Sequence, residues 1–413
     1  MRLAFRDYQV ADFIDKNEFN NVSFLETARA AIRNARLHQA MARAKARYHL
    51  TITYNRDRIL TSELTGPNLQ RSYSVRRRVQ LKMSDLVRHA DELNILLSRG
   101  DTDTWRDRAA VIGNSLHQLL AKDPQVINNI TMARALAQPP ADIWLQFSGP
   151  SHGLELPFEL LRDGDEYLAL SHILTRRLTS SDTTFLRNIG PFHTFIEDLL
   201  QNNKMLRVLV VGADNNGAIP AAIDEAKALS DQIEADLTML SIPHMIVTLV
   251  GEQANYISVG QELRSGRHHI FHYAGYSHAA DEPSQSDSPT PRDGLSIRSL
   301  TAESLNLLVQ DKGLQMMYLS CGLGARTPAQ VGRGDFHSTL EALTRAGVPV
   351  VLGYRWTVAD KLARELAQHF YQALWRTFSP STALLEARQA IALGSYGRDD
   401  ETWASPVLLM QNG

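Results

Sequence analysis

The sequence predicts an α/β protein with a largely parallel central sheet between helical layers, which is a three-layer fold. Three observations support this class. The apolar run 205–213 is short and continuous, as in a strand buried on both faces. Amphipathic segments such as 221–237 and 254–266 follow this strand or lie between later ones. Strands that alternate with helices form βαβ units, whose right-handed crossovers favour parallel pairing.

The first third of the chain is expected to mix helices and strands. Residues 22–47 are rich in Ala, Arg and Leu and lack Gly and Pro, which favours one long helix. Residues 48–55 and 74–82 alternate in polarity and carry β-branched or aromatic side chains, which indicates strands. Residues 84–137 have a helical pattern that is interrupted at 99–103.

Two more strands precede the middle of the chain. IWLQF (143–147) and HILTRRL (172–178) have strand patterns, and a turn follows the first of them. Pro157 fits the first position of a helical element between the two strands. A helix near 183–202 then ends in the polar QNNK (201–204).

We place a boundary around 195–204, which divides the chain into an N-terminal half, 1–195, and a second half, 196–413. The second half is expected to alternate to its end, apart from a polar loop at 280–294. The expected order is strand 205–213, helix 221–237, strand 244–250, helix 254–266, strand 268–274, helix 301–311, strand 314–320, helix 336–347, strand 348–353, helices 359–378 and 381–394, and strand 405–411.

Composition excludes several classes of function. The chain has 413 residues, a formal net charge of -2 and one cysteine. The charge balance gives no overall attraction to nucleic acid or to an anionic membrane, and the arginines within 74–82 are read as charges that protect a sheet edge. No apolar run approaches the length of a membrane span, and the first residues lack a signal-peptide pattern. One cysteine cannot form an intrachain disulfide, so we expect a cytoplasmic protein.

Polar residues with reactive side chains follow three of the predicted strands. Asp214 follows the strand at 205–213, HYAGYSH (272–278) ends the strand at 268–274, and Cys321 comes directly after the strand at 314–320. Carboxyl ends of parallel strands share one edge of a sheet, where ligands bind. We therefore expect these residues to lie close together.

A cysteine with a nearby histidine is the equipment of a thiol nucleophile, because the imidazole can take the thiol proton. Gly275 and Gly322 would let substrate and backbone approach closely, and backbone N–H groups can stabilise an oxyanion. Other interpretations exist. A lone cysteine is often a small buried hydrophobe, and a strand-end histidine is often a structural hydrogen-bond partner. No phosphate-loop motif and no second cluster of metal ligands accompanies the histidines, so neither a cofactor nor a metal is expected.

Several segments together resemble the CHAT proteins, a family of caspase-like proteases. The resemblance runs from about residue 140 to the C-terminus. It implies a clan CD cysteine protease fold whose second half carries the active site, preceded by a degenerate caspase-like or helical half. The segments are LELPFELLRDGDEYLAL, FHYAG, YLSCGLGA, LTRAGVPVVLGYRWTVAD, HFYQAL, LLEARQAI and WASPVLLMQ.

One position departs from the family pattern, which usually reads H-[FY]-[AS]-G-H-G with a catalytic second histidine. Tyr276 stands in that place here. If Tyr276 and Ser277 are an insertion, His278 becomes the base, 43 residues before Cys321. Otherwise the histidine is lost and the chain is a pseudoprotease. His272 matches the family's first, non-catalytic histidine, and it precedes Cys321 by 49 residues, near the caspase spacing of about 50.

The resemblance also implies the class of substrate and partner. The expected activity is cleavage of a partner protein, switched on by another protein, in a bacterial defence or programmed-death pathway. Asp214, or alternatively Asp335, would recognise a basic side chain before the scissile bond through a charge-assisted pair. The competing hypothesis is a catalytically degenerate interaction protein on the same fold, which would hold a partner through the cleft or the basic segment 74–82.

Overall fold

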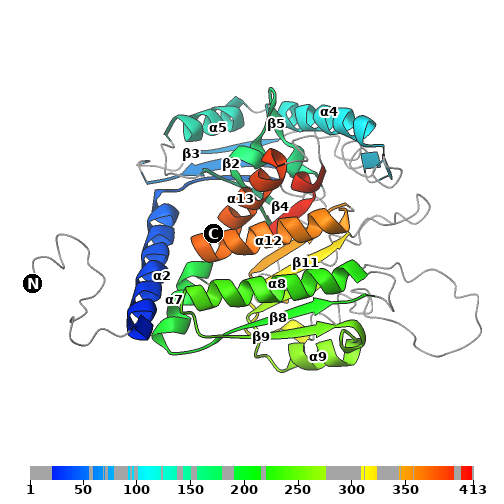
Figure 1. Cartoon of the computed structure of the whole chain (residues 1–413). Helices are drawn as coiled ribbons and strands as arrows, with labels where there is room; N and C mark the ends of the chain where they lie inside the picture. Colours follow the sequence, from blue (N-terminus) through cyan, green and yellow to red (C-terminus); the bar gives the residue numbers. More distant parts are fainter. Residues whose placement is uncertain are drawn as a thin grey trace, which may run out of the picture.

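Most apolar runs of the sequence form strands of one sheet that crosses the molecule (Figure 1). The computed structural model describes residues 21–54, 59–67, 69, 73–78, 92–93, 95–96, 101–121, 124–136, 143–149, 156–178, 190–214, 220–275, 308–310, 312–322, 344, 346–356, 358–394 and 401–411.

The sheet has 11 strands in the order β3-β2-β1-β4-β7-β13-β12-β11-β10-β8-β9, and a two-stranded hairpin, β5-β6, stands apart from it. In chain order the strands are β1 (Tyr48–Tyr54), β2 (Ile59–Thr65), β3 (Tyr73–Arg78), β4 (Ile143–Gly149), β5 (Arg162–Asp163), β6 (Glu166–Tyr167), β7 (Ile173–Leu178), β8 (Leu206–Gly212), β9 (His244–Val250), β10 (Ile270–Ala274), β11 (Met316–Gly322), β12 (Val350–Tyr354) and β13 (Pro406–Met410).

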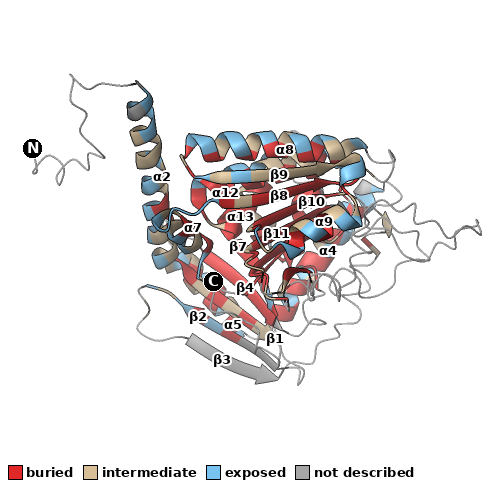
Figure 2. Cartoon of the chain, turned by 90° about the horizontal axis from the view of Figure 1, so that it is seen from below, coloured by how far each residue is buried: buried red, intermediate tan, exposed pale blue. Residues whose placement is uncertain are grey.

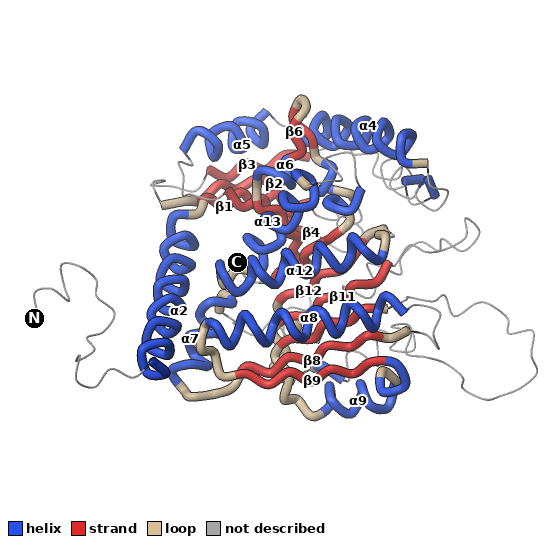
Figure 3. Tube along the Cα trace, in the orientation of Figure 1, coloured by secondary structure: helices blue, strands red, loops and turns tan. Residues whose placement is uncertain are grey.

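Helices lie against the sheet, and α8 and α12 run side by side across it (Figure 3). The α-helices are α2 (Asn21–Ala46), α4 (Thr102–Ala121), α5 (Pro124–Leu136), α6 (Leu168–Ser171), α7 (Phe192–Gln201), α8 (Pro220–Met239), α9 (Tyr256–Arg264), α12 (Asp360–Thr377) and α13 (Pro380–Leu393). Single 3-10 turns are η2 (Phe158–Leu160), η4 (Gly251–Gln253) and η5 (Glu401–Ala404).

The strands of the second half form a parallel block. β9, β8, β10, β11 and β12 are neighbours in that order, and each of these pairings is parallel. Although β8 comes first along the chain, it lies between β9 and β10. The direction of winding therefore reverses between β8 and β10, which is the point where open α/β sheets bind ligands.

Strand β13 connects this block to the first half. It is antiparallel to β12 and parallel to β7, and β7, β4 and β1 continue the sheet in parallel. Among the described pairings of the 11-stranded sheet, only β1–β2, β2–β3 and β12–β13 are antiparallel. The predicted α/β class with a largely parallel sheet is confirmed. Strands from both sides of residue 195 share this one sheet, so the sheet does not mark a boundary there. The division at residue 195 stays a prediction.

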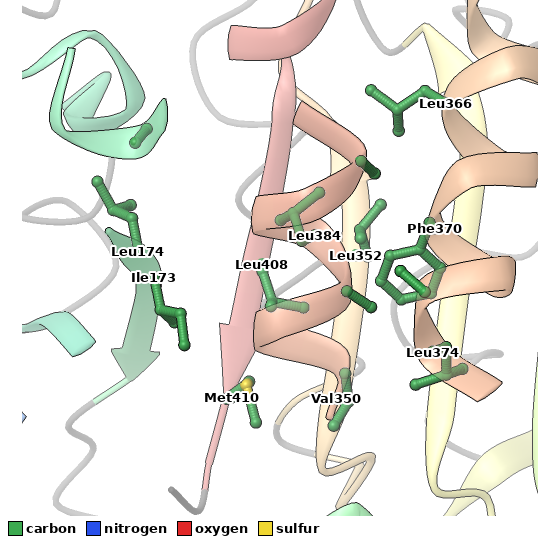
Figure 4. Close-up of a cluster of buried hydrophobic side chains, with 14 of the residues drawn as sticks. Ile173, Leu174, Val350, Leu352, Leu366, Phe370, Leu374, Leu384, Leu408 and Met410 are labelled. Carbon is green, nitrogen blue, oxygen red and sulfur yellow. The ribbon is translucent and has the colours of Figure 1, made fainter. Parts of the chain in front are cut away.

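Side chains on alternate positions of each strand enter two separate cores, as the pleat of a strand requires. Ile270 belongs to the larger core, under α8, α12 and α13, whereas Phe271 and Tyr273 belong to the smaller core, under α9. Figure 2 shows the central strands as buried and the outer surface of α8 as largely exposed. Figure 4 shows part of the larger core, where Leu352 of β12 lies beside Phe370 of α12 and Leu408 of β13 lies beside Leu384 of α13.

Most predicted elements form with ends shifted by a few residues, and the exceptions are instructive. The sequence analysis did not predict β2. The element expected at Pro157 is a single 3-10 turn, because Gly164, with a φ of 61°, reverses the chain into the β5–β6 hairpin. Helix α7 begins after Pro191, later than expected. The helices expected at 301–311 and 336–347 lie almost entirely outside the described residues, as does the loop at 280–294.

Candidate active site

Three of the predicted site segments meet at the carboxyl edge of β8, β10 and β11. Ala274, the last residue of β10, is in register with Gly212 on β8 and with Ser320 on β11. Two backbone hydrogen bonds extend these pairings: the Ala213 N–H donates to the Ala274 carbonyl (2.9 Å), and the Gly275 N–H donates to the Ser320 carbonyl (3.3 Å). Asp214, Gly275 and Cys321 follow directly, so the structure brings their backbones to neighbouring positions.

Gly275 occupies a position that has little room for a side chain. A Cβ atom there would lie 2.7 Å from the Tyr273 hydroxyl and 3.1 Å from the Ala213 carbonyl oxygen. Both separations are below ordinary van der Waals contact, so the backbone comes close to its neighbours because the residue is glycine. Asp214, on the adjacent strand end, is partly buried and partly open to solvent.

The backbone of Cys321 lies in an irregular part of β11. Leu319 pairs with Gly353 of β12, and the next registered pair is Gly322 with Tyr354, so the register shifts between them. Such β-bulges are frequent beside active sites, where they redirect a side chain. The preceding residue, Ser320, is buried, and its hydroxyl has no hydrogen-bond partner in the described part of the chain.

The structure does not describe the other residues expected in the site. His278, Tyr276 and Asp335 lie outside the described residues, and for Gly322 and Cys321 the description covers the backbone. The described residues contain no group of three or more His, Cys, Asp and Glu side chains with a geometry suited to a metal ion.

His272 is placed differently from the strand-end residues. Its side chain is 0% exposed and is turned toward α8 and α12. One ring nitrogen, Nε2, lies 3.1 Å from Oε1 of Glu225 on α8, and the other, Nδ1, lies 3.4 Å from the Tyr371 hydroxyl on α12. The ring also packs against Tyr318 at 4.8 Å between centroids. Both nitrogens are therefore engaged inside the core.

Three tyrosines extend this polar network through the helix-side core. The hydroxyls of Tyr318 and Tyr354 lie 3.0 Å apart, and Tyr354 donates to the Ala363 carbonyl at 3.2 Å. Burial raises the pKa of Tyr318 well above its usual value, with further contributions from Tyr354 and Glu225. Burial and the Glu225 charge likewise raise the pKa of Tyr371. These phenols stay protonated and able to donate hydrogen bonds at neutral pH.

The sequence analysis did not identify this network. Glu225 lies on α8 among Ala222, Ala226 and Leu229, which are all buried. A carboxylate on the apolar stripe of an amphipathic helix was the available signal, since a buried carboxylate requires a partner. A structural role for a strand-end histidine such as His272 was among the interpretations, but its pairing with Glu225 was not predicted.

No helix in the described part of the chain is both long and apolar enough to cross a membrane. No curated protein matches the sequence.

Comparison with solved structures finds distant similarities. Two crystal structures of the Saccharomyces cerevisiae separase–securin complex match 96% of this chain, with 11% identity and TM-scores of 0.48 and 0.49. This chain covers 32% of those chains, about a third of their length. The complex of Porphyromonas gingivalis RgpB pro- and mature domains matches 70% of this chain and 69% of its own, with 12% identity and a TM-score of 0.43. Similarities this distant assign no function.

The comparison with protein families is more informative. The model of the CHAT domain matches residues 111–411, which is most of the chain and begins before the segment in which the sequence motifs were found. The predicted resemblance is confirmed. The chain belongs to the CHAT domain family of caspase-like, clan CD proteases.

Proposed function

We propose that the protein is a cysteine endopeptidase in which Cys321 is the nucleophile and His278 is the base. The observation that carries the proposal is the shared edge of β8, β10 and β11, which brings Gly275 next to Cys321 at the point where the sheet reverses its winding. His278 follows Gly275 by three residues in the sequence, so it is tethered close to the end of β10.

The proposed chemistry is acyl transfer. His278 takes the proton of Cys321, and the thiolate attacks the carbonyl carbon of the scissile peptide bond. The C–N bond then breaks as His278 gives its proton to the leaving amine, and water hydrolyses the thioester and restores the thiol. Backbone N–H groups around Gly322, in the irregular part of β11, would receive the oxyanion. Asp214 would pair with an Arg or Lys side chain before the scissile bond.

The geometry supports His278 over His272 as the base. The His272 ring is buried between Glu225 and Tyr371, and each ring nitrogen has a partner there. A base must reach the thiol proton within hydrogen-bond distance, and a ring held against α8 and α12 points away from the strand edge. The alternative, a pseudoprotease that binds partners, is favoured by one feature, which is Tyr276 in place of the family's second histidine.

The proposed substrate is a partner protein, and a second protein would switch the activity on. The family's role in bacterial defence or programmed death is the proposed setting. The test below therefore includes neighbouring gene products.

Labelling of the thiol is the sharpest test, because Cys321 is the only cysteine in the chain. The rate of alkylation by iodoacetamide between pH 5 and 9 reports the pKa of that thiol directly. We expect a reactive thiolate below pH 8 in the wild type and a shift toward the ordinary value near 8.5 in His278→Ala. His38→Ala, at an exposed position on α2, is the matched control.

Hydrolysis of a mixed fluorogenic peptide library, with and without neighbouring gene products, completes the test. Activity should disappear in Cys321→Ala and His278→Ala and persist in His38→Ala. His272→Asn must be compared at equal folded fraction, because its side chain is in the core. A thiol with an ordinary pKa and no hydrolysis under any condition would replace the proposal with the pseudoprotease.

A further inference from the structure

The sheet ends at β9, which is an edge strand at one side of the molecule. All seven residues of β9 are in register with β8, and no backbone hydrogen bond joins the middle of β9 to any other described segment. Figure 2 looks at the molecule from this side and shows β9 with α8 on one face of the sheet and α9 on the other. An edge strand leaves one row of N–H and C=O groups available to another strand.

The bonding between β8 and β9 shows which backbone groups of β9 are available. The Leu206 N–H donates to the Pro243 carbonyl at 2.8 Å. In a parallel pair a residue directs its N–H and its C=O to the same side, and successive residues alternate. Pro243 and the odd-numbered residues after it therefore face β8. The even-numbered residues, with Ile246 and Thr248 in the middle, direct their backbone groups to the open edge.

The sequence of β9 does not protect this edge. Natural edge strands avoid unwanted pairing through charged side chains, proline or a bulge. HMIVTLV contains no Lys, Arg, Asp, Glu or Pro, and its register with β8 runs without interruption from His244 to Val250. The strand at the other side of the sheet, β3, reads YSVRRR and ends in three arginines. One edge of the sheet is therefore protected by charge, whereas the other is suited to pairing.

We propose that β9 pairs antiparallel with β9 of a second copy of this chain, across a two-fold axis at Val247. This register puts Ile246 of each copy opposite Thr248 of the other, and each such pair exchanges two hydrogen bonds. His244 and Val250 form the outer pairs. An axis one residue to either side would leave an end residue of β9 without a partner strand. Pairing of one surface with itself about a two-fold axis is the commonest form of protein dimer.

The side chains on the α9 face suit this pairing. Met245 is 40% exposed, and the pairing places it opposite Leu249 of the second copy. The two Val247 side chains meet at the axis. Val247 and Leu249 already pack, partly buried, against the smaller core, so the dimer extends that core across the axis and removes further apolar surface from water.

On the other face, charges of α8 are complementary across the same axis. The Ser230 and Thr248 hydroxyls lie 2.8 Å apart, which sets the level of α8 along β9. Lys227 and Glu234, three residues before and four after Ser230, are exposed and lie on the same side of the helix.

As the crossover between two parallel strands, α8 runs antiparallel to β9. With rises of about 1.5 Å per helical residue and about 3.3 Å per strand residue, the axis crosses α8 about two residues after Ser230. Lys227 then lies within about one helical turn of Glu234 of the second copy. Pairs this exposed steer the two copies together more than they hold them.

The pairing leaves both candidate active sites accessible. Because the two β9 strands are antiparallel, the carboxyl edges of the two parallel blocks point in opposite directions. The two sites therefore open on opposite sides of one continuous sheet, and the pairing does not depend on protease activity.

Sedimentation velocity of the intact chain between about 1 and 100 µM should show a monomer–dimer equilibrium. Met245→Lys places a charge opposite Leu249 of the second copy and should raise the dissociation constant of the dimer about tenfold or more. Met239→Lys is the matched control, because Met239 is 42% exposed but lies near α2 and α12 rather than at the edge, and it should leave the constant unchanged. Circular dichroism confirms that both variants are folded.

A disulfide tests the register independently, because Cys321 is the only cysteine. In a Cys321→Ala chain, Val247→Cys brings two thiols together in a non-hydrogen-bonded pair with Cα atoms about 4.5 Å apart, which suits a disulfide. Met245→Cys is the control, since its two copies would lie about 13 Å apart along the strands. Mild oxidation should give covalent dimers of the Val247→Cys chain only.

Three results would overturn the proposal. The first is a chain that stays monomeric at every concentration. The second is a dimer that Met245→Lys does not weaken, which would show that another surface forms it. The third is the absence of a cross-link through Val247→Cys, or an equal cross-link through Met245→Cys.

Discussion

The pair formed by His272 and Glu225 gives a prediction whose magnitude follows from the structure. Both side chains are inside the core, at 0% and 5% exposure, and 3.1 Å separates the two bonded atoms. His272→Leu would leave the Glu225 carboxylate buried without its donor, which costs about 3–5 kcal/mol for a broken buried pair. Glu225→Leu removes the charge and leaves one imidazole N–H unpaired, which costs about 1–3 kcal/mol.

Two comparisons are informative: the cost of His272→Leu against that of Glu225→Leu, and the cost of the double variant against the sum of the two. The double variant removes both polar groups and replaces them with apolar ones, so its cost should fall below the sum of the singles by about 0.5–3 kcal/mol. Tyr371→Phe should cost about 1 kcal/mol or less, because its 3.4 Å contact to His272 is long for a hydrogen bond.

Urea unfolding followed by circular dichroism measures all four variants, with Glu234→Gln on the exposed side of α8 as the control, expected within about 0.5 kcal/mol of wild type. Additive single and double costs would refute the reasoning. A His272→Leu cost smaller than that of Glu225→Leu would show that the carboxylate is solvated rather than held by the histidine.

Three further predictions concern other residues. Burial, helped by the nearby Arg47 charge, lowers the pKa of His49 to about 4, so the folded state keeps this ring neutral while the unfolded state binds a proton. The free energy of unfolding should therefore be highest above pH 6.5 and should fall by about 3 kcal/mol in all as pH drops toward 4, at about 1.4 kcal/mol per pH unit. His49→Phe keeps the ring contact with Trp144 but cannot bind a proton, so its free energy of unfolding should change much less across that interval. Gly275→Ala should cost about 1–3 kcal/mol in urea unfolding, because its Cβ would meet a carbonyl oxygen at 3.1 Å; a cost near zero would mean that the strand end relaxes freely. Asp214→Asn should lower kcat/KM for substrates with Arg or Lys before the scissile bond at least tenfold and leave neutral ones unchanged, and an equal loss for both would exclude the proposed pairing.

Local patterns predicted most strands and helices of this fold, because hydrophobic periodicity is a property of short segments. The run 205–213 is apolar throughout and became β8, and 359–378 has a helical stripe and became α12. Which strands pair with each other was harder to predict from the sequence than where the strands lie. Strand β13 was expected at 405–411, but its place between β7 and β12, antiparallel to β12, depends on contacts far apart in the sequence.

The candidate site likewise has features that could be predicted from the sequence and features that could not. That Asp214, Gly275 and Cys321 would gather at one edge could be predicted, since carboxyl ends of parallel strands share an edge. The bulge at Ser320 and the pairing of His272 with Glu225 could not, because the first depends on the register with β12 and the second on how α8 crosses the sheet. A histidine at the end of an apolar run has the same sequence signature whether it is a base or a core residue.

The buried network also bears on how the proposed site keeps its geometry. Side chains alternate along a strand, so a one-residue slip of β10 would turn His272 to the face covered by α9 and leave Glu225 unpaired under α8. The same slip would move Gly275 away from its bond to the Ser320 carbonyl, next to Cys321. A core of apolar residues alone would penalise such a slip less, because both faces of β10 are apolar. The polar pair behind the strand therefore fixes the register that brings the two loops of the proposed active site together.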